Sequence, residues 1–489
     1  MRAANVTWTG ISVHDVKLMD FSVSEFKTYV LRTGDILLAE ASGSASEVGK
    51  PAVWLDQVPD CCFQNTLIRV RAPAELVPFL HLHFYKDAST GAFGRASRGV
   101  GIHHLGASTL SDWDVKFPPL PEQHRIVEAI ESYFTRLDDA VATLERVQRN
   151  LQRYRAAVLK AAVEGRLVPT EAELARAEGR DYEPASVLLE RILAERRRRW
   201  EEAELAKMKA RGKVPKDDRW KAKYKAPVAP DTDDLPELAE GWCWASIDQL
   251  ADHQASALTD GPFGSNLKTS HYTRMGPRVI RLQNIGDGEF INAEAHISLE
   301  HYQKLLKHAV HAGDVVIASL GDILPRACVV PDWLGNAIVK ADCIRFAVYP
   351  SGMLPTFAVC ALNSSRARKV AKDVIHGVGR PRIGLTLLRS FPLPVPPLRE
   401  QERIVSEVER LHSVEMATLA STRLQTLRLT SLRQSILKWA FEGRLVDQDP
   451  TDEPASALLD RIKAERDARD GRKGTARAGG TARPGVSVR

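Results

Sequence analysis

The chain has 489 residues, of which 44% are hydrophobic and 27% charged, as in ordinary globular proteins with room for two or more domains. No apolar run reaches the roughly 18 residues that a membrane-spanning helix needs, and the first residues lack the apolar stretch of a signal peptide. Six cysteines without a CxxC pair or metal-ligand spacing predict a cytoplasmic protein with reduced thiols and no metal site, and the net charge is +6.

The positive charge is concentrated in two segments. Residues 190–225 hold 14 Lys and Arg against 7 Asp and Glu, and residues 471–489 add five Lys and Arg and no acid. Proteins that bind DNA phosphates usually carry basic patches on their folded faces, so this charge argues only weakly for nucleic acid. The arginine run at 196–199 is equally compatible with a solvated helix face.

Residues 1–120 mix short β-branched runs, such as TLIRV at 66–70, with Gly, Pro and Asn, which predicts a compact α/β globule. A long helix is predicted over 121–168, because residues 122–168 contain no proline and Gly165 marks the end. Apolar residues recur in it every seven positions, which is typical of a coiled coil. They are Ile130, Leu137, Leu144, Leu151 and Val158, with Phe134 and Val141 between them.

Residues 169–234 are predicted to form a charged linker with a helical segment, and residues 235–398 a second α/β globule. A second long helix is predicted over 399–446, followed by a C-terminal helical segment and a basic disordered tail over 447–489. The second heptad pattern is poorer, because Glu415 and Thr422 replace apolar residues between Val408, Leu429 and Ile436. Other leucines suggest a shifted or broken register; they are Leu411, Leu424, Leu427 and Leu432.

The two halves of the chain are a repeat. PLPEQHRIV at 119–127 returns as PLREQERIV at 397–405, and EGRLV at 164–168 returns at 442–446, both with an offset of 278 residues. Further anchors are GVG at 99–101 and 377–379, TGDIL at 33–37 against AGDVV at 312–316, and EPAS at 183–186 and 453–456. A period this long indicates a duplicated domain with its connector, since solenoid units run about 20 to 50 residues.

Signatures of catalysis are missing from the sequence. The segment 43–50 resembles a phosphate-binding loop, but its glycine spacing is one residue too long and Pro51 stands where Ser or Thr should be. There is also no GxSxG, no HExxH and no plausible zinc constellation. We therefore predict no catalytic residues in this chain.

The combination of motifs resembles the specificity subunits of type I restriction–modification systems. The resemblance rests on the PL-x-EQ-x-RIV and EGRLV repeats, on DEPAS at 452–456, on LPELAEGW at 235–242 and on GPFGS at 261–265. It covers nearly the whole chain and implies an α+β protein, with two duplicated α/β DNA-recognition domains joined by two long helices in an antiparallel coiled coil.

The resemblance also implies a function. Each globule would be a target recognition domain that reads one half of a split site on double-stranded DNA, with the helices setting the distance between halves. The partners would be two adenine methyltransferase subunits and separate ATP-dependent translocase and nuclease subunits. S-adenosylmethionine, ATP and Mg²⁺ would belong to those partners, with no cofactor in this chain.

The chain departs from the family at its beginning. RAANV at 2–6 aligns with RLQNI at 281–285, yet the second globule has 46 residues from 235 to 280 before that point. We expect either about 45 further residues encoded in frame upstream of Met1 or a truncated gene, and the activity of the first recognition domain depends on which holds.

Side chains that make two hydrogen bonds to one base edge, such as Arg, Lys, Asn and Gln, can read DNA sequence. Loops of small residues let the backbone approach a phosphate closely. These two criteria select the DNA-binding candidates. In the second globule the candidates are Phe263, Ser265, Asn266, Lys268, Arg281, Gln283, Asn284, Ser319, Arg380 and Arg382. In the first globule they are Arg2, Asn5, Ser42, Ser44, Lys50, Arg98 and His104. Arg281 and Asn284 could instead cap strand ends.

The starts of the two helices are candidates for docking the methyltransferase, with helix capping and hinge-setting as the alternative for the carboxylates. The residues are Glu122, Gln123, Arg125, Glu400, Gln401 and Arg403. Two other functions fit the sequence less well. One is a coiled-coil scaffold with a non-functional first recognition domain, and the other is the specificity module of a fused methyltransferase–nuclease.

Overall fold

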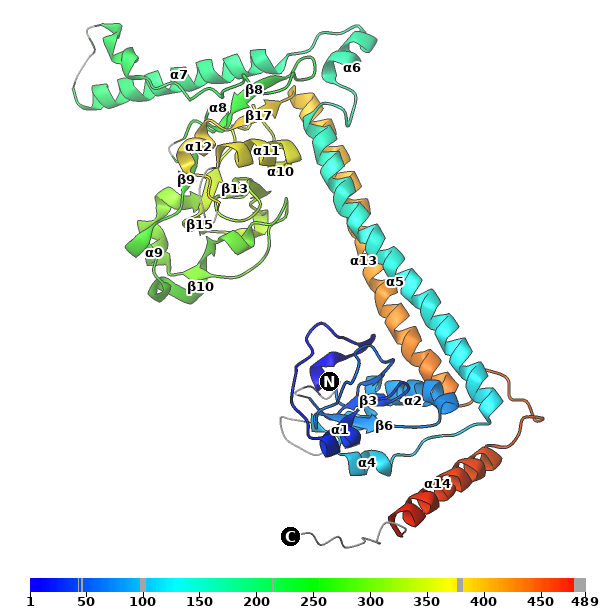
Figure 1. Ribbon diagram of the computed structural model, residues 1–489. Coiled ribbons are helices and arrows are strands. Elements are labelled where there is room, and N and C mark those ends of the chain that lie inside the picture. Colours follow the sequence, from blue (N-terminus) through cyan, green and yellow to red (C-terminus); the bar gives the residue numbers. More distant parts are fainter. Residues whose placement is uncertain are drawn as a thin grey trace, which may run out of the picture. The chain divides into compact units, whose positions relative to one another are not determined.

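The computed structural model describes residues 1–42, 44, 47–96, 103–212, 215, 217–254, 256–375 and 381–478. The chain divides into two compact units, one formed by Met1–Val147 with Ser421–Arg489 and the other by Gln148–Ala420 (Figure 1). They are called here the first and the second unit, and each is described by itself.

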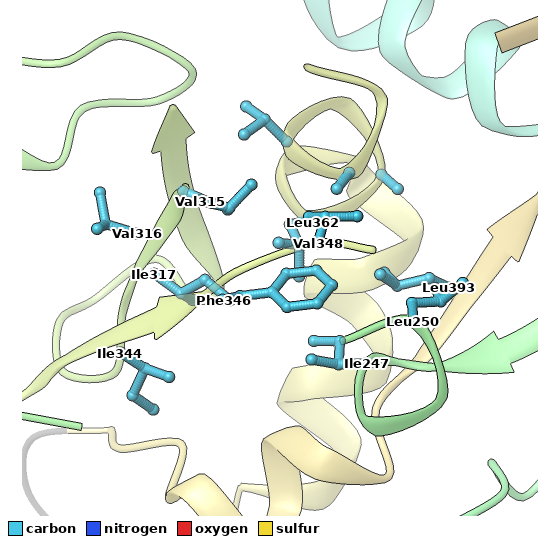
Figure 2. Packing of buried hydrophobic residues seen from close by; sticks show 14 of the residues in the cluster. Ile247, Leu250, Val315, Val316, Ile317, Ile344, Phe346, Val348, Leu362 and Leu393 are labelled. Atoms are coloured by element: carbon cyan, nitrogen blue, oxygen red, sulfur yellow. The ribbon is translucent and has the colours of Figure 1, made fainter. Parts of the chain in front are cut away.

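The globule of the second unit contains an antiparallel sheet in the order β14-β13-β16-β9. Its strands are short: Leu258–Asp260 (β9), Val315–Ala318 (β13), Arg326–Val329 (β14) and Cys343–Phe346 (β16), of which β13 is a β-branched run that the sequence predicts. Figure 2 shows the Phe346 side chain pointing from this sheet toward Ile247, Leu250 and Leu393, in one large apolar core. Burial of this core provides the main stabilisation of the second globule.

A second sheet in the same globule has the order β11-β10-β15-β12, and β10 and β15 run parallel. Its strands are Tyr272–Ile280 (β10), His296–Ile297 (β11), Ala309–Val310 (β12) and Ala337–Val339 (β15). A two-stranded ribbon joins Cys243–Ser246 (β8) to Pro392–Val395 (β17). The helices around the sheets are Ile247–Leu250 (α8), Leu299–Lys304 (α9), Pro355–Asn363 (α10), Ser365–Val374 (α11) and Leu385–Arg389 (α12).

The globule of the first unit repeats part of this plan with a three-stranded antiparallel sheet in the order β5-β3-β6. The strands are Ile36–Ala39 (β3), Pro51–Val53 (β5) and Leu67–Val70 (β6), and Val77–Ser89 (α2) corresponds to α10 at an offset of 278. Smaller strands are Val6–Thr7 (β1), Gly10–Ile11 (β2), Ala41–Ser42 (β4) and His103–His104 (β7). The short helices are Val23–Tyr29 (α1), Ala92–Ala96 (α3) and Ala107–Ser111 (α4).

Both predicted long helices are present, each 44 residues long: Leu120–Val163 (α5) and Leu398–Phe441 (α13). Each ends before a glycine with positive φ, Gly165 at 67° and Gly443 at 70°, which is the conformation that terminates helices. The helices therefore stop a few residues earlier than the predicted limits at 168 and 446.

The two helices pair antiparallel within each unit. In the first unit Ile130 and Leu137 of α5 share a buried cluster with Ile436 and Leu437 of α13. In the second unit Val158 and Leu159 of α5 line the same hollow as Val405 and Val408 of α13. The apolar seam predicted from the heptads is thus the surface through which the helices meet.

The predicted shift of register in α13 is wrong. Glu415 and Thr422 are buried at the heptad positions, whereas Leu424 and Leu427 are 49% and 69% exposed. The sequence pattern was misleading because α13 keeps its phase while placing polar side chains in the seam. The Glu415 carboxylate lies 3.2 Å from Nδ1 of His412, which gives it a local polar partner.

The predicted helical linker contains Glu171–Glu178 (α6), Ala185–Ala210 (α7) and a 3₁₀ turn at Asp218–Lys223, and Ala455–Ala478 (α14) is the C-terminal helix. The arginine run lies on α7. Arg197 pairs with Glu201, and both Arg198 and Arg199 pair with Glu195. These exposed pairs within one helix support the interpretation of a solvated face.

Candidate nucleic-acid interface

In the second unit a set of loops brings together residues that are far apart in the sequence. Leu320, two residues after the end of β13, forms an isolated antiparallel bridge with Arg382. The Arg382 guanidinium lies 3.0 Å from the Asp342 carboxylate and 5.5 Å from the centre of the Phe263 ring. Half of the Arg382 side chain and 45% of Phe263 are exposed, so an exposed cation rests on an exposed aromatic ring.

The glycine-rich loop that carries Phe263 is tightly packed at its base. A Cβ on Gly261 would lie 2.0 Å from the carbonyl carbon of Lys340, so only glycine fits there. Beyond it the predicted residues Ser265, Asn266 and Lys268 are exposed. His301 Nε2 lies 2.9 Å from the Asn266 carbonyl oxygen and holds the loop from the side of α9. The loop thus presents small polar groups and a lysine on a fixed backbone, as phosphate contact requires.

Two predicted residues of this half are buried and serve the fold. Ser319 is 2% exposed, and its backbone bonds to Asp342 and Ile383. Asn284 is 1% exposed, accepts a hydrogen bond from the Arg281 N–H at 2.9 Å and donates to the carbonyls of Ile291 and Ala293. The prediction that Asn284 and Ser319 face DNA is therefore wrong, because both side chains lie inside the globule.

The Arg281 guanidinium also takes part in this turn and donates to the carbonyls of Ala293 and Glu294. Gln283 is exposed beside it and remains a candidate. Arg380 lies outside the described residues.

The same turn occurs in the first unit at the repeated positions. Asn5 is 3% exposed, accepts from the Arg2 N–H at 3.0 Å and donates to the carbonyls of Ser12 and Asp15. The Arg2 guanidinium forms an ion pair of 2.7 Å with Asp15. Asn5 therefore joins Asn284 as a structural residue, in agreement with the strand-capping alternative.

The bridge of the second unit also has a counterpart in the first. There β4 pairs with β7, so that Ala41 faces His104, as Leu320 faces Arg382. The exposed His104 ring lies 3.3 Å from the Glu40 carboxylate, which takes the place of the Asp342 partner. The repeat thus holds an arginine in one half and a histidine in the other at the same bridge.

The other predicted residues of the first unit are less well placed. Lys50 is half-buried, paired with Glu47 and 5.9 Å from the Trp8 ring, so its charge is directed inward. Ser44 is exposed, and Ser42 pairs with His103 through the backbone. The Ser42 side chain and the whole of Arg98 lie outside the described parts of the structure.

The predicted docking residues at the start of α13 lie in an internal joint. Glu400 is fully buried and accepts from the Trp242 indole N–H at 2.9 Å and from the Glu171 N–H at 2.8 Å. Burial raises the pKa of Glu400 against these two hydrogen bonds. Gln401, also fully buried, accepts from the Leu354 N–H and donates to the carbonyls of Gly352 and Pro396.

Arg403 completes this joint by pairing with Glu171 at 2.7 Å. Burial alone would raise the pKa of Glu171, but hydrogen bonds from Arg403 and Arg180 outweigh it and leave this pKa lowered. These contacts fix α6 against the start of α13, which is the hinge-setting role.

At the start of α5 Glu122 and Gln123 are buried too, and Gln123 donates to the Pro118 carbonyl at 2.8 Å. Arg125 pairs with Asp452 at 2.8 Å. The prediction of an exposed docking surface therefore does not hold for Glu122, Gln123, Glu400 and Gln401, whose side chains lie inside their units.

Sequence analysis missed Asp342, which pairs with Arg382, and it did not predict that Leu320 bridges to Arg382 or that Trp242 bonds to Glu400. The pairing of residues 40 to 160 positions apart leaves no local pattern, and only the repeat of Ala41 and His104 could have indicated the bridge. Across the described ranges no group of three or more potential ligand side chains could hold a metal ion, and no described helix is long and apolar enough to span a membrane.

Comparison with known proteins gives consistent matches. The family model of the type I restriction modification DNA specificity domain matches residues 5–147. The specificity subunit of the type I restriction enzyme EcoBI from Escherichia coli is 26% identical over 393 residues, which cover 78% of this chain and 70% of that protein. The StySPI specificity subunit from Salmonella potsdam is 24% identical over 454 residues, covering 90% of this chain and 82% of that protein.

A solved structure shares the fold. It was described in work on complex assembly and conformational transition of the type I R-M system, and it superimposes with a TM-score of 0.57 at 16% identity over 91% of both chains. This likeness shows a common overall fold.

Proposed function

We propose that this chain is a specificity subunit of a type I restriction–modification system and that it reads a split DNA site, one half with each globule, because it is similar to such subunits over most of its length. It is the non-catalytic component of the complex. Two adenine methyltransferase subunits and ATP-dependent nuclease subunits would act on the DNA that it selects, and S-adenosylmethionine, ATP and Mg²⁺ would be bound by those partners.

One observation carries the split-site proposal: the same bridge occurs in both globules and holds a different side chain in each. Arg382 and His104 occupy equivalent positions beside an acidic partner and are both exposed. An arginine donates two hydrogen bonds to a guanine edge, whereas a histidine offers one ring nitrogen at a time. Two side chains at the same position of the repeat, with different hydrogen-bonding groups, support the proposal that the two globules read different half-sites in the same way.

A second candidate has support in the first unit. Among its described residues the sheet has the three strands β5, β3 and β6, and residues 114–117 have no strand partner there. A first globule that cannot read DNA would leave a scaffold with one working recognition domain. The same experiment separates the two functions.

The experiment replaces residues 235–398 with the corresponding domain of the EcoBI relative and maps the methylated sites in cells that also produce the methyltransferase partner. We expect one half of the motif to change and the other half to stay, because each globule has its own core. The control restores the native domain through the same cloning junctions.

A change in both halves would contradict independent reading. A native motif with defined bases in only one half would favour the scaffold with a single active domain.

A further inference from the structure

In the second unit a hollow of about 160 Å³ lies between the globule and the two long helices, and we call it the Glu415 hollow. Its walls come from α10 and β14 of the globule, from the last turns of α5 and from the first half of α13. All of these parts belong to the second unit. A cavity of about 150 Å³ holds one benzene ring, so the hollow has room for a group of that size.

The equivalent positions of the first unit, at an offset of 278, are filled by apolar side chains. These side chains, which belong to one cluster, are Leu82, Tyr85, Phe134 and Leu137. Their counterparts in the wall of the Glu415 hollow are, in the same order, Cys360, Asn363, His412 and Glu415. Each counterpart is smaller or more polar, so the second unit leaves open a space that the first unit fills.

The first unit also shows how an aromatic ring is held at this place. The Arg433 guanidinium lies 4.3 Å from the centre of the Phe134 ring, and the Tyr85 ring lies 6.4 Å from Phe134 on the side of α2. Arg433 corresponds to Arg155, which lines the Glu415 hollow. The second unit therefore keeps the cation of this arrangement and has the smaller imidazole of His412 in place of the phenyl ring.

The charges of the wall favour a positively charged ligand. Among the described residues of the wall, the charged side chains are Arg155, Glu409 and Glu415, which leaves one excess negative charge while His412 is neutral. Arg155 donates to the Asp287 carbonyl, and Glu415 is 6% exposed and lies 3.2 Å from Nδ1 of His412. A carboxylate accepts more than one hydrogen bond, and those from cations are the strongest.

We propose that the Glu415 hollow binds a small molecule with one aromatic ring and one protonated amine. The ring takes the place that Phe134 has in the first unit, with the Arg155 guanidinium on its face, and the ammonium group donates to Glu415. Such a ligand contacts the globule and both helices of the second unit. This inference does not depend on the reading of DNA, and its tests contain no DNA.

The probe is benzylamine, titrated into the full chain by isothermal titration calorimetry. We expect saturable binding at concentrations up to about 10 mM, where a ligand of this size should bind. Benzyl alcohol should bind at least about tenfold more weakly, because a neutral hydrogen bond replaces a charge-assisted one. Cyclohexylmethylamine, which has the charge but no aromatic ring, should bind at least about threefold more weakly. Absent binding of benzylamine, or equal binding of benzylamine and benzyl alcohol, would overturn the proposal.

The carboxylate is tested with Glu415→Gln, which keeps the shape of the side chain and an acceptor for His412. Benzylamine should bind this variant at least about tenfold more weakly, whereas binding of benzyl alcohol should change less than about twofold. The matched control is Glu402→Gln, which removes an exposed carboxylate of α13 that does not line the hollow. Equal losses in the two variants would assign the effect to the total charge of the chain and overturn the site.

The location is tested by filling the hollow with the side chains of the first unit. The double variant Cys360→Leu, His412→Phe should no longer bind benzylamine and should unfold within a few degrees of the native chain, because the same side chains pack together in the first unit. Unchanged benzylamine binding in this variant would overturn the location. Loss of the methyltransferase subunit from this variant, without benzylamine binding by the native chain, would assign the hollow to a side chain of that partner instead.

Discussion

Arg382 offers the sharpest test of DNA reading, because half of its side chain is exposed and its two contacts are both small in energy. The variants are Arg382→Gln, which removes the cation, and Asp342→Asn, which removes its acidic partner. Asp342 has a φ of 68°, a conformation that asparagine adopts readily, so the second variant leaves the turn intact. One variant removes the proposed reading group and the other frees it.

The structure sets the expected magnitudes. An exposed ion pair is worth about 0–1 kcal/mol and an exposed cation–π contact about 0.5–1 kcal/mol, so Arg382→Gln should cost the fold less than about 2 kcal/mol. A bidentate contact to guanine is worth about 1–3 kcal/mol, so affinity for the cognate site should fall about 5- to 150-fold. Asp342→Asn should raise affinity about 2- to 10-fold, since Arg382 no longer leaves an ion pair and a negative charge near phosphate is gone.

The assay is fluorescence anisotropy of the methyltransferase complex with a duplex that carries its methylated motif and with a scrambled duplex, at several salt concentrations. The control variant is Arg389→Gln. Arg389 is the last residue of α12 and forms an ion pair of 2.6 Å with Asp248 of α8, so we expect this variant to leave DNA binding unchanged. If Asp342→Asn weakened binding as much as Arg382→Gln, the pair would only shape the loop. If neither changed affinity, the reading role of Arg382 would be refuted.

Two further predictions concern the long helices. Glu415→Leu should raise the free energy of unfolding by about 1–3 kcal/mol, because Glu415 is buried beside a hollow of about 160 Å³ and the equivalent residue of the first repeat is Leu137. Thermal unfolding measures this change, and a loss of stability would contradict the prediction. One heptad inserted after Leu144 and one after Thr422 should keep the seam in phase and lengthen the unspecified gap of the methylated motif by about one to three base pairs. Methylome sequencing measures the gap, and an active complex with an unchanged gap would exclude a spacing role for the helices.

The fold could be predicted from the sequence where the local pattern of a segment and the repeat of that segment indicate the same structure. The β-branched runs became β13 and β6, and the heptads of α5 became its buried seam. The inference of a shifted register failed in α13, because it followed the other leucines, whereas burial follows the heptad phase even where the residue is polar. That phase is set over the whole length of α13, and Glu415 and Thr422 follow it.

The candidate site was less accessible, because side-chain type does not tell which way a side chain faces. Asn284 and Asn5 have the amide that reads adenine, but both amides bond backbone carbonyls of their own turn. Arg382 was predicted for the same chemical reason, and half of its side chain is exposed. The difference between them is made by Leu320 and Asp342, which contact Arg382 from distant parts of the chain.

The two helix starts show how one motif acquires two environments. PL-x-EQ-x-RIV buries a glutamate in both units, and in the second unit Trp242 and the Glu171 N–H satisfy it. In the first unit the same glutamate, Glu122, faces a hollow that Phe79 and Phe441 only partly fill. A carboxylate is kept inside a protein at the cost of its hydration, and only a donor offsets that cost. The repeated motif therefore fixes the burial of its glutamate, whereas the partners of that glutamate come from residues outside the motif.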